Sequence, residues 1–176
     1  LCERLLEQGA HVICVDNFFT GARSNIIHLL GHPMFELMRH DVTFPLYVEV
    51  DEIYNLACPA SPVHYQFDPV QTTKTSVHGA INMLGLAKRT GAKIFQSSTS
   101  EVYGSAQFAP MTEDHPLAAP HPYGASKIAA DRMCYAYNQT YHMNITIVRP
   151  FNAFGPRQKD TGYGGVMSIF VKRVMS

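Results

Sequence analysis

Short apolar runs rich in Val and Ile alternate along this chain with longer stretches of helical periodicity. This alternation is typical of βαβ units, whose parallel strands are buried on both faces. We therefore expect an α/β fold with a Rossmann-type, doubly wound parallel sheet. The expected strands are residues 11–16, 35–40, 52–57, 93–98 and 144–149.

Two long stretches predict helices between these strands. One covers residues 68–89 and is closed by Gly91, and the other runs from about Pro122 to Tyr141. The apolar residues from Val70 to Ala87 recur at helical spacing, and we assign that face to the core. Shorter amphipathic helices are expected over residues 1–8 and from Gly165 onward.

Composition and charge exclude several classes of partner. Lys and Arg number 14 and Asp and Glu also number 14, so the chain lacks the basic surplus that binds nucleic acid or an anionic membrane. No segment approaches the roughly 18 apolar residues of a membrane span. The four cysteines lie far apart, and Gly31 breaks any helix that would align His28 with His32. We expect reduced thiols, no metal and a cytoplasmic protein.

The pattern with the clearest chemistry is Tyr123 followed by Lys127. A spacing of four on a helix places the phenol and the ammonium group on one face, one turn apart. A nearby positive charge favours the phenolate, which lets a tyrosine act as a general base. Alone, such a pair is more often an ordinary surface pair. Upstream, however, the run from Ser97 to Gly104 leaves the end of an expected strand, where doubly wound sheets bind ligands.

Polar and small residues also follow the earlier strands. Asp16, with Asn17, ends the second strand of such a sheet, where a carboxylate accepts hydrogen bonds from an adenosine ribose and favours NAD over NADP. Asp41 and Val42 follow the next strand, at the position expected for adenine. Leu56 and Ala57 follow another, where the backbone can approach a cofactor. Each of these signals alone is also consistent with an ordinary turn.

Together these segments resemble the extended short-chain dehydrogenase/reductase family, in its group of nucleotide-sugar epimerases, dehydratases and decarboxylases. The resemblance spans essentially the whole chain. Its landmarks are Val15-Asp16-Asn17, Asn55-Leu56-Ala57, the run from Ser98 to Gly104, the run from Tyr123 to Lys127, and the run from Arg149 to Arg157.

The resemblance implies a role for each matching residue. Thr99, Tyr123 and Lys127 would form the catalytic triad, with Ser100 and Glu101 beside them. Asn152 and Arg157 would contact the nucleoside diphosphate of a nucleotide-sugar substrate, which we expect to be UDP-linked. The cofactor would be NAD, contacted also by Ser97 and Pro150. The resemblance further implies a homodimer.

We expect residues 1–176 to form an incomplete NAD-binding domain, with the start of the substrate-binding part near residues 151–176. In the family a first strand and a glycine-rich loop precede the helix that we expect at residues 1–8, and no G-x-G-x-x-G run occurs in this sequence. We therefore expect a chain truncated at both ends.

Several reactions remain open within the family. The runs from Asp16 to Gly21 and from Ala57 to Pro62 resemble the UDP-glucuronate decarboxylases, which form UDP-xylose. Ser100 is too weak an acid for classical 4,6-dehydration. The Tyr123 to Lys127 run instead resembles UDP-sugar 4-epimerases and related dehydratases. Decarboxylation is the leading hypothesis, epimerisation or a related dehydration the alternative, and a non-catalytic NAD-binding module a remote one.

Overall fold

All five predicted strands are confirmed, each slightly shorter than expected. The computed structural model describes residues 1–155, 158 and 166–175. Strands β1 (Val12–Asp16) and β2 (Phe35–Arg39) pair in parallel, with Val12 opposite Phe35. Strands β3 (Glu52–Asn55), β4 (Lys93–Ser97) and β5 (Ile145–Val148) form a second parallel sheet in that order. The α/β prediction is correct.

The two long helices lie where their periodicity places them. Helix α3 (Pro69–Thr90) begins at Asp68, whose side chain accepts a hydrogen bond from the backbone N–H of Gln71 at 2.8 Å. It ends at Gly91, whose φ of 76° suits glycine. Helix α4 (Pro122–Tyr141) is capped by His121. The shorter elements are α1 (Cys2–Glu7), α2 (Pro62–Phe67), α5 (Val166–Met175) and the 3₁₀ helices η1 (Arg23–Asn25), η2 (Ile27–Leu29) and η3 (Ser100–Val102).

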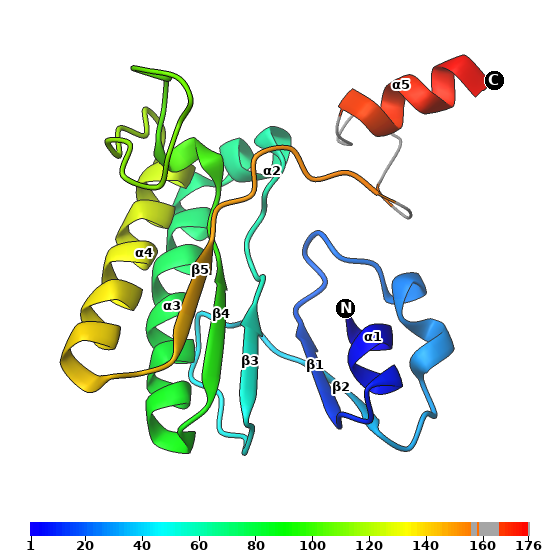
Figure 1. Ribbon diagram of the computed structural model, residues 1–176. Helices are drawn as coiled ribbons and strands as arrows, with labels where there is room; N and C mark the ends of the chain where they lie inside the picture. The colour runs from blue at the N-terminus through cyan, green and yellow to red at the C-terminus, as the bar shows by residue number, and fades with distance from the viewer. Residues whose placement is uncertain (156–157, 159–165, 176) are drawn as a thin grey trace.

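Helices α3 and α4 pack against each other and cover one face of the three-stranded sheet (Figure 1). The main core lies between these helices and the sheet. It contains Ile53, Met83, Leu84, Leu86, Ala87, Ala92, Ile94 and Cys134.

The predicted core face of α3 is wrong at two of its apolar positions. Val70 is 63% exposed and Ile81 43% exposed, whereas Thr72 and Ser76 are buried. The two buried hydroxyls are hydrogen-bonded, Thr72 to the carbonyl of Tyr65 at 3.4 Å and Ser76 to the thiol of Cys58 at 3.1 Å. Satisfied polar groups can be buried at low cost, so apolar periodicity alone misplaced this face.

The described strands form two sheets where the sequence predicts one. Figure 1 shows β1 and β2, with α1, beside the three-stranded sheet, but no ladder joins β1 to β3 among the described residues. The separation divides the polar strand ends into two groups, one on each sheet. Within the described part of the chain, no helix is both long and apolar enough to cross a bilayer.

Candidate active site

The end of β4 is held close to the end of β5 by backbone and side-chain contacts. Thr99 follows β4 and caps η3, and its hydroxyl oxygen accepts a hydrogen bond from the backbone N–H of Glu101 at 3.2 Å. The N–H of Ser100 donates to the carbonyl of Pro150, beyond β5, at 3.1 Å. These bonds place predicted site residues from two strand ends side by side.

The first turn of α4 is tied to η3 by His121. Its Nδ1 accepts a hydrogen bond from the N–H of Gly124 at 3.1 Å, so the ring proton is on Nε2. That nitrogen donates to the Glu101 carboxylate at 3.0 Å. Glu101 therefore lies beside the start of α4, and its side chain remains 51% exposed.

Tyr123 and Lys127 both lie on the buried face of α4, as their spacing predicts. They are 5% and 4% exposed. Tyr123 is hydrogen-bonded to the side chain of Thr99. The Lys127 ammonium nitrogen lies 5.9 Å from the centre of the Tyr123 ring and donates to the carbonyl of Ser97 at 3.0 Å. The structure thus brings together Ser97, Thr99, Tyr123 and Lys127.

Burial has the largest effect on the pKa of Tyr123. Burial raises the pKa of Tyr123 to about 12, and the hydrogen bond from Thr99 opposes this only in part. Burial also lowers the pKa of Lys127, against the opposing effects of Cys58 and Asp131. Desolvation thus outweighs the stabilisation of the phenolate that the Tyr-Lys spacing predicts. The phenol is the resting form at neutral pH.

A second group of predicted residues gathers at the ends of β1 and β2. The Asn17 amide donates to the Asp41 carboxylate at 3.2 Å, and Asp16 accepts from the N–H of Phe18 at 2.7 Å. Burial acts to raise the pKa of Asp41, but its hydrogen bonds with Thr43 and Asn17 outweigh burial and leave the pKa lowered. Both carboxylates therefore lie at this strand edge as acceptors.

The backbone at Gly21 lies close against the Asp16 carboxylate. A Cβ atom on Gly21 would lie 2.8 Å from the Asp16 carboxylate oxygen Oδ2. A larger residue at position 21 would therefore displace the carboxylate or the backbone.

The remaining predicted residues occupy varied environments. Val42 is buried, and its carbonyl accepts from Asn82 of α3 at 2.8 Å, which fixes the segment after β2. Leu56 is 53% exposed and Ala57 half-buried, both just after β3. Asn152 is exposed in the segment after β5. Arg157 lies outside the described residues.

Two residues of this site were missed by the sequence analysis. The Tyr65 ring, from α2, stacks on Tyr123 with ring centres 4.6 Å apart and planes 4° apart. Asp131 lies one turn beyond Lys127 on α4 and is 2% exposed. Only Asp131 carried a usable signal, because it continues the spacing of four from Tyr123 and Lys127.

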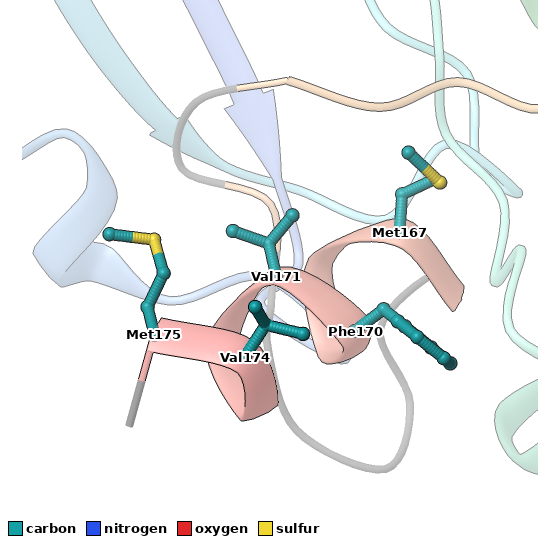
Figure 2. Close-up of a pocket in the computed structure, with 5 residues that line it drawn as sticks. All are labelled: Met167, Phe170, Val171, Val174 and Met175. Atoms are coloured by element: carbon teal, nitrogen blue, oxygen red, sulfur yellow. The ribbon is translucent and has the colours of Figure 1, made fainter.

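Helix α5 carries a separate apolar hollow. Figure 2 shows that its lining side chains all come from this one helix: Met167, Phe170, Val171, Val174 and Met175. None of the predicted site residues contributes to it. The hollow is therefore distinct from the polar strand ends described above.

Comparison with known proteins relates this geometry to nucleotide-sugar enzymes. Residues 1–175 match the family model described as GDP-mannose 4,6 dehydratase. The chain is 45% identical over 181 residues to UDP-glucuronic acid decarboxylase 6 of Arabidopsis thaliana, covering 99% of this chain and 52% of that relative. It thus spans about half the length of this curated relative.

Two solved structures share the fold over nearly the whole chain. The UDP-glucose 4-epimerase of Thermus thermophilus, in complex with NAD, gives a TM-score of 0.80 at 27% identity and covers 99% of this chain and 58% of that one. The dTDP-glucose 4,6-dehydratase of Streptomyces venezuelae, with NAD bound, gives 0.81 at 27% identity, with coverages of 98% and 57%. The similarity extends across epimerase and dehydratase structures alike.

Proposed function

The chain belongs to the GDP-mannose 4,6-dehydratase family, and on that premise we propose that the protein is an NAD-dependent enzyme that modifies a nucleotide-sugar through a 4-keto intermediate. The observation that carries the proposal is the grouping of Thr99, Tyr123 and Lys127 at the end of β4, with Thr99 hydrogen-bonded to the phenol. We further propose decarboxylation of UDP-glucuronate to UDP-xylose as the reaction, supported by the 45% identity to a curated decarboxylase.

The residues at the ends of β1 and β2 fit the adenosine half of NAD. Asp16 would accept hydrogen bonds from the ribose hydroxyls. Asn17, Asp41 and Val42 would border the adenine. On the other sheet, Lys127 would hold the nicotinamide ribose, near Ser97 and Pro150. When bound, NAD supplies the hydride acceptor and returns the hydride later in the cycle.

Tyr123 and Thr99 have different roles at the 4-hydroxyl group of the sugar. Tyr123 takes the proton of the 4-hydroxyl group as the hydrogen on C4 leaves as hydride, and Thr99 hydrogen-bonds to the same oxygen. Because burial keeps the phenol protonated at rest, its deprotonation requires positive charge nearby, from Lys127 and from the bound nicotinium ring. Lys127 therefore has an electrostatic role as well as a binding one.

The product depends on the substituent at C5. A carboxylate there makes the 4-keto sugar a β-keto acid, which loses carbon dioxide because the ketone accepts the electron pair of the broken bond. Reduction of the resulting 4-ketopentose completes UDP-xylose. Ser100 and Glu101 adjoin this position in the proposal, and Asn152 and Arg157 would contact the diphosphate.

The direct test is to incubate the full-length protein with NAD and UDP-glucuronate. We expect release of carbon dioxide together with UDP-xylose, identified by mass spectrometry and NMR. Recovery of unchanged UDP-glucuronate would contradict decarboxylation.

A 4-epimerase is the second candidate, favoured by the close packing at the start of α4. A Cβ on Gly124 would lie 2.7 Å from the Ala119 Cβ and 3.0 Å from the carbonyl oxygen of Glu101, so this helix start requires glycine. The glycine belongs to the Tyr123 to Lys127 run that resembles epimerases. This reading predicts interconversion of UDP-glucose and UDP-galactose, or of the corresponding uronates or N-acetyl sugars. Formation of no 4-epimer from any of them would exclude it.

We also propose that the chain acts as a homodimer in a reducing, cytoplasmic setting. Exposed apolar side chains on α3 and α4, among them Val70, Ile81 and Tyr135, support a helix-mediated interface. Cys2, Cys14, Cys58 and Cys134 are free thiols. Light scattering of the full-length protein at micromolar concentration tests the dimer, and a monomeric mass would contradict it.

A further inference from the structure

Asp131 is a buried carboxylate that the proposed reaction does not use. Its Oδ2 accepts hydrogen bonds from the Ser98 hydroxyl and from Nε of Arg149, each at 2.9 Å. Ser98 directly follows β4 and Arg149 directly follows β5. One oxygen atom thus fastens α4 to the ends of two neighbouring strands.

Arg149 extends this network toward the residues that follow η3. Its Nη1 donates to the Tyr103 hydroxyl at 2.9 Å, and to the carbonyl of Glu113 at 3.5 Å. The guanidinium also lies 5.2 Å from the centre of the Tyr103 ring. The contacts of Asp131 therefore reach the end of β4, which Thr99 follows, and the end of β5, which Pro150 follows.

The negative charge of Asp131 is only partly satisfied by these bonds. Its second oxygen, Oδ1, is buried without a hydrogen-bond partner among the described residues. A buried ion pair can often be replaced by apolar side chains without loss of stability, so folding alone does not explain a carboxylate here. The position of the charge, one helical turn from Lys127, suggests an electrostatic role.

The titratable groups around Lys127 define the electrostatic role that Asp131 has there. The titratable groups that face it are Tyr123 and Asp131 on α4 and Cys58 from the segment after β3. Those that interact with Asp131 are Arg149, Lys127 and Cys134. Burial lowers the pKa of Lys127, while Cys58 and Asp131 oppose that change. Burial raises the pKa of Asp131, and the hydrogen bonds from Arg149 and Ser98 oppose that rise by stabilising the carboxylate.

We infer that Asp131 is a positioning residue for Lys127: it holds α4 against the ends of β4 and β5 and faces the ammonium group with a buried negative charge. The inference rests on the proposed function for its effect on catalysis. Its effect on Lys127 itself is independent of any substrate. Asp131 acts through Lys127 and is not itself a catalytic residue.

The test is the titration of Lys127 in the full-length protein carrying ¹³C- and ¹⁵N-labelled lysine. The Lys127 NMR signal is assigned by its loss in Lys127→Arg. In Asp131→Asn we expect its titration midpoint to fall by about one pH unit or more, as for loss of a unit charge one helical turn away in a buried site. The alkaline limb of the kcat profile should move to lower pH by the same amount.

Glu52→Gln is the matched control. Glu52 also accepts from a hydroxyl, that of Tyr54 at 2.9 Å, and pairs with a cation, Lys93 at 3.6 Å, but it lies exposed on β3. This change should leave both the Lys127 midpoint and the kcat profile unmoved. Asp131→Glu, which keeps the charge, should keep the midpoint close to that of the unaltered protein.

Loss of one charge from a buried pair can prevent folding, so a second variant removes both charges. Asp131→Asn/Arg149→Gln keeps a neutral hydrogen-bonding pair, and thermal melting establishes that it folds. A lowered Lys127 midpoint in this folded variant supports the inference, and an unchanged midpoint in the folded variants overturns it. Absence of turnover with every nucleotide-sugar would contradict the proposed function alone. The inference about Asp131 would still be tested, because the Lys127 titration needs no substrate.

Discussion

At the scale of the residue, Tyr123 combines burial with a fixed orientation. Its ring stacks on Tyr65, its hydroxyl is bonded to Thr99, and the ring is 5% exposed. These contacts leave the phenol few alternative positions. A pre-oriented proton acceptor lowers the entropic cost of reaching the reactive geometry.

Replacing Tyr123 by Phe should remove the proton acceptor while keeping the stacked ring. We expect kcat to fall by roughly 10²- to 10⁴-fold, the usual contribution of a general base, with an unchanged circular dichroism spectrum. Tyr135→Phe is the control, because Tyr135 lies on the same helix but is 56% exposed. Near-normal turnover in Tyr123→Phe would refute the assigned role.

The raised pKa of Tyr123 also predicts a dependence of stability on pH. The ordinary tyrosine pKa is 10.0, and the folded value is about 12, so the folded state retains the proton more strongly than the unfolded state. This contribution is complete below about pH 10 and is lost as pH rises toward 12. Thermal melting between pH 9 and 11.5 should therefore show a smaller loss of Tm in Tyr123→Phe than in the unaltered protein. Equal losses would contradict burial as the cause.

The sequence identified the residues whose spacing or position carries chemical meaning. Tyr123 and Lys127 share a helix face, and Thr99 follows a strand end, so the structure brings them together as predicted. Tyr65 could not be predicted, because it reaches Tyr123 through a short helix with no periodic signal. The rise in the Tyr123 pKa that burial causes could not be predicted, since local spacing contains no measure of burial.

At the scale of the element, the start of α4 determines where Tyr123 lies. His121, Gly124 and Glu101 join this turn to η3 through two hydrogen bonds and a close backbone approach. The same turn carries Tyr123 and lies beside Thr99. A small displacement here would separate Tyr123 from Thr99, the two groups proposed to act on the sugar hydroxyl.

Gly124→Ala should cause such a displacement. The added Cβ would meet the carbonyl oxygen of Glu101 at 3.0 Å, so the helix start must shift. We expect kcat to fall roughly ten- to a hundred-fold, the order expected for misplacement by a fraction of an ångström to one ångström. Gly85→Ala on α3 is the control, because nothing lies within 4 Å of its added Cβ. That change should raise stability by about 0.5 to 1 kcal/mol in urea unfolding and leave kcat unaltered.

The capping of α3 gives a separate stability prediction. Asp68 accepts a hydrogen bond from Gln71 at 2.8 Å at the helix start. Asp68→Ala should therefore lower the free energy of unfolding by about 1 kcal/mol in urea denaturation. Asp68→Asn should restore most of the loss, because its amide oxygen can accept the same bond. No change in either variant would show that this cap does not stabilise α3.

Periodicity predicted the strands and all but one of the α-helices. Strands β1 to β5 and helices α3 and α4 follow from sustained apolar patterns and from Gly91 and Pro122. Helix α2 was missed, in the short segment between an expected strand and the helix expected from residue 68. The exposed positions Val70 and Ile81 were misassigned, because tertiary packing decides which face of a helix becomes buried.

At the scale of the whole molecule, the candidate site has two parts on two sheets. Asp16, Asn17 and Asp41 lie at the ends of β1 and β2, and Thr99, Tyr123 and Lys127 lie at the end of β4 and on α4 (Figure 1). A dinucleotide is a ligand that could contact both parts, with its adenosine at one and its nicotinamide at the other.

The proposed reaction oxidises the sugar transiently at C4. Deuterium at that carbon reports whether the hydride leaves and returns. The full-length protein is supplied with NAD and UDP-glucuronate deuterated at C4, or with UDP-glucose deuterated at C4. We predict a slower reaction than with the unlabelled sugar if hydride transfer limits the rate, and product that retains deuterium at C4 in ordinary water. Loss of the deuterium to solvent, with product still formed, would contradict hydride transfer from C4 and its return.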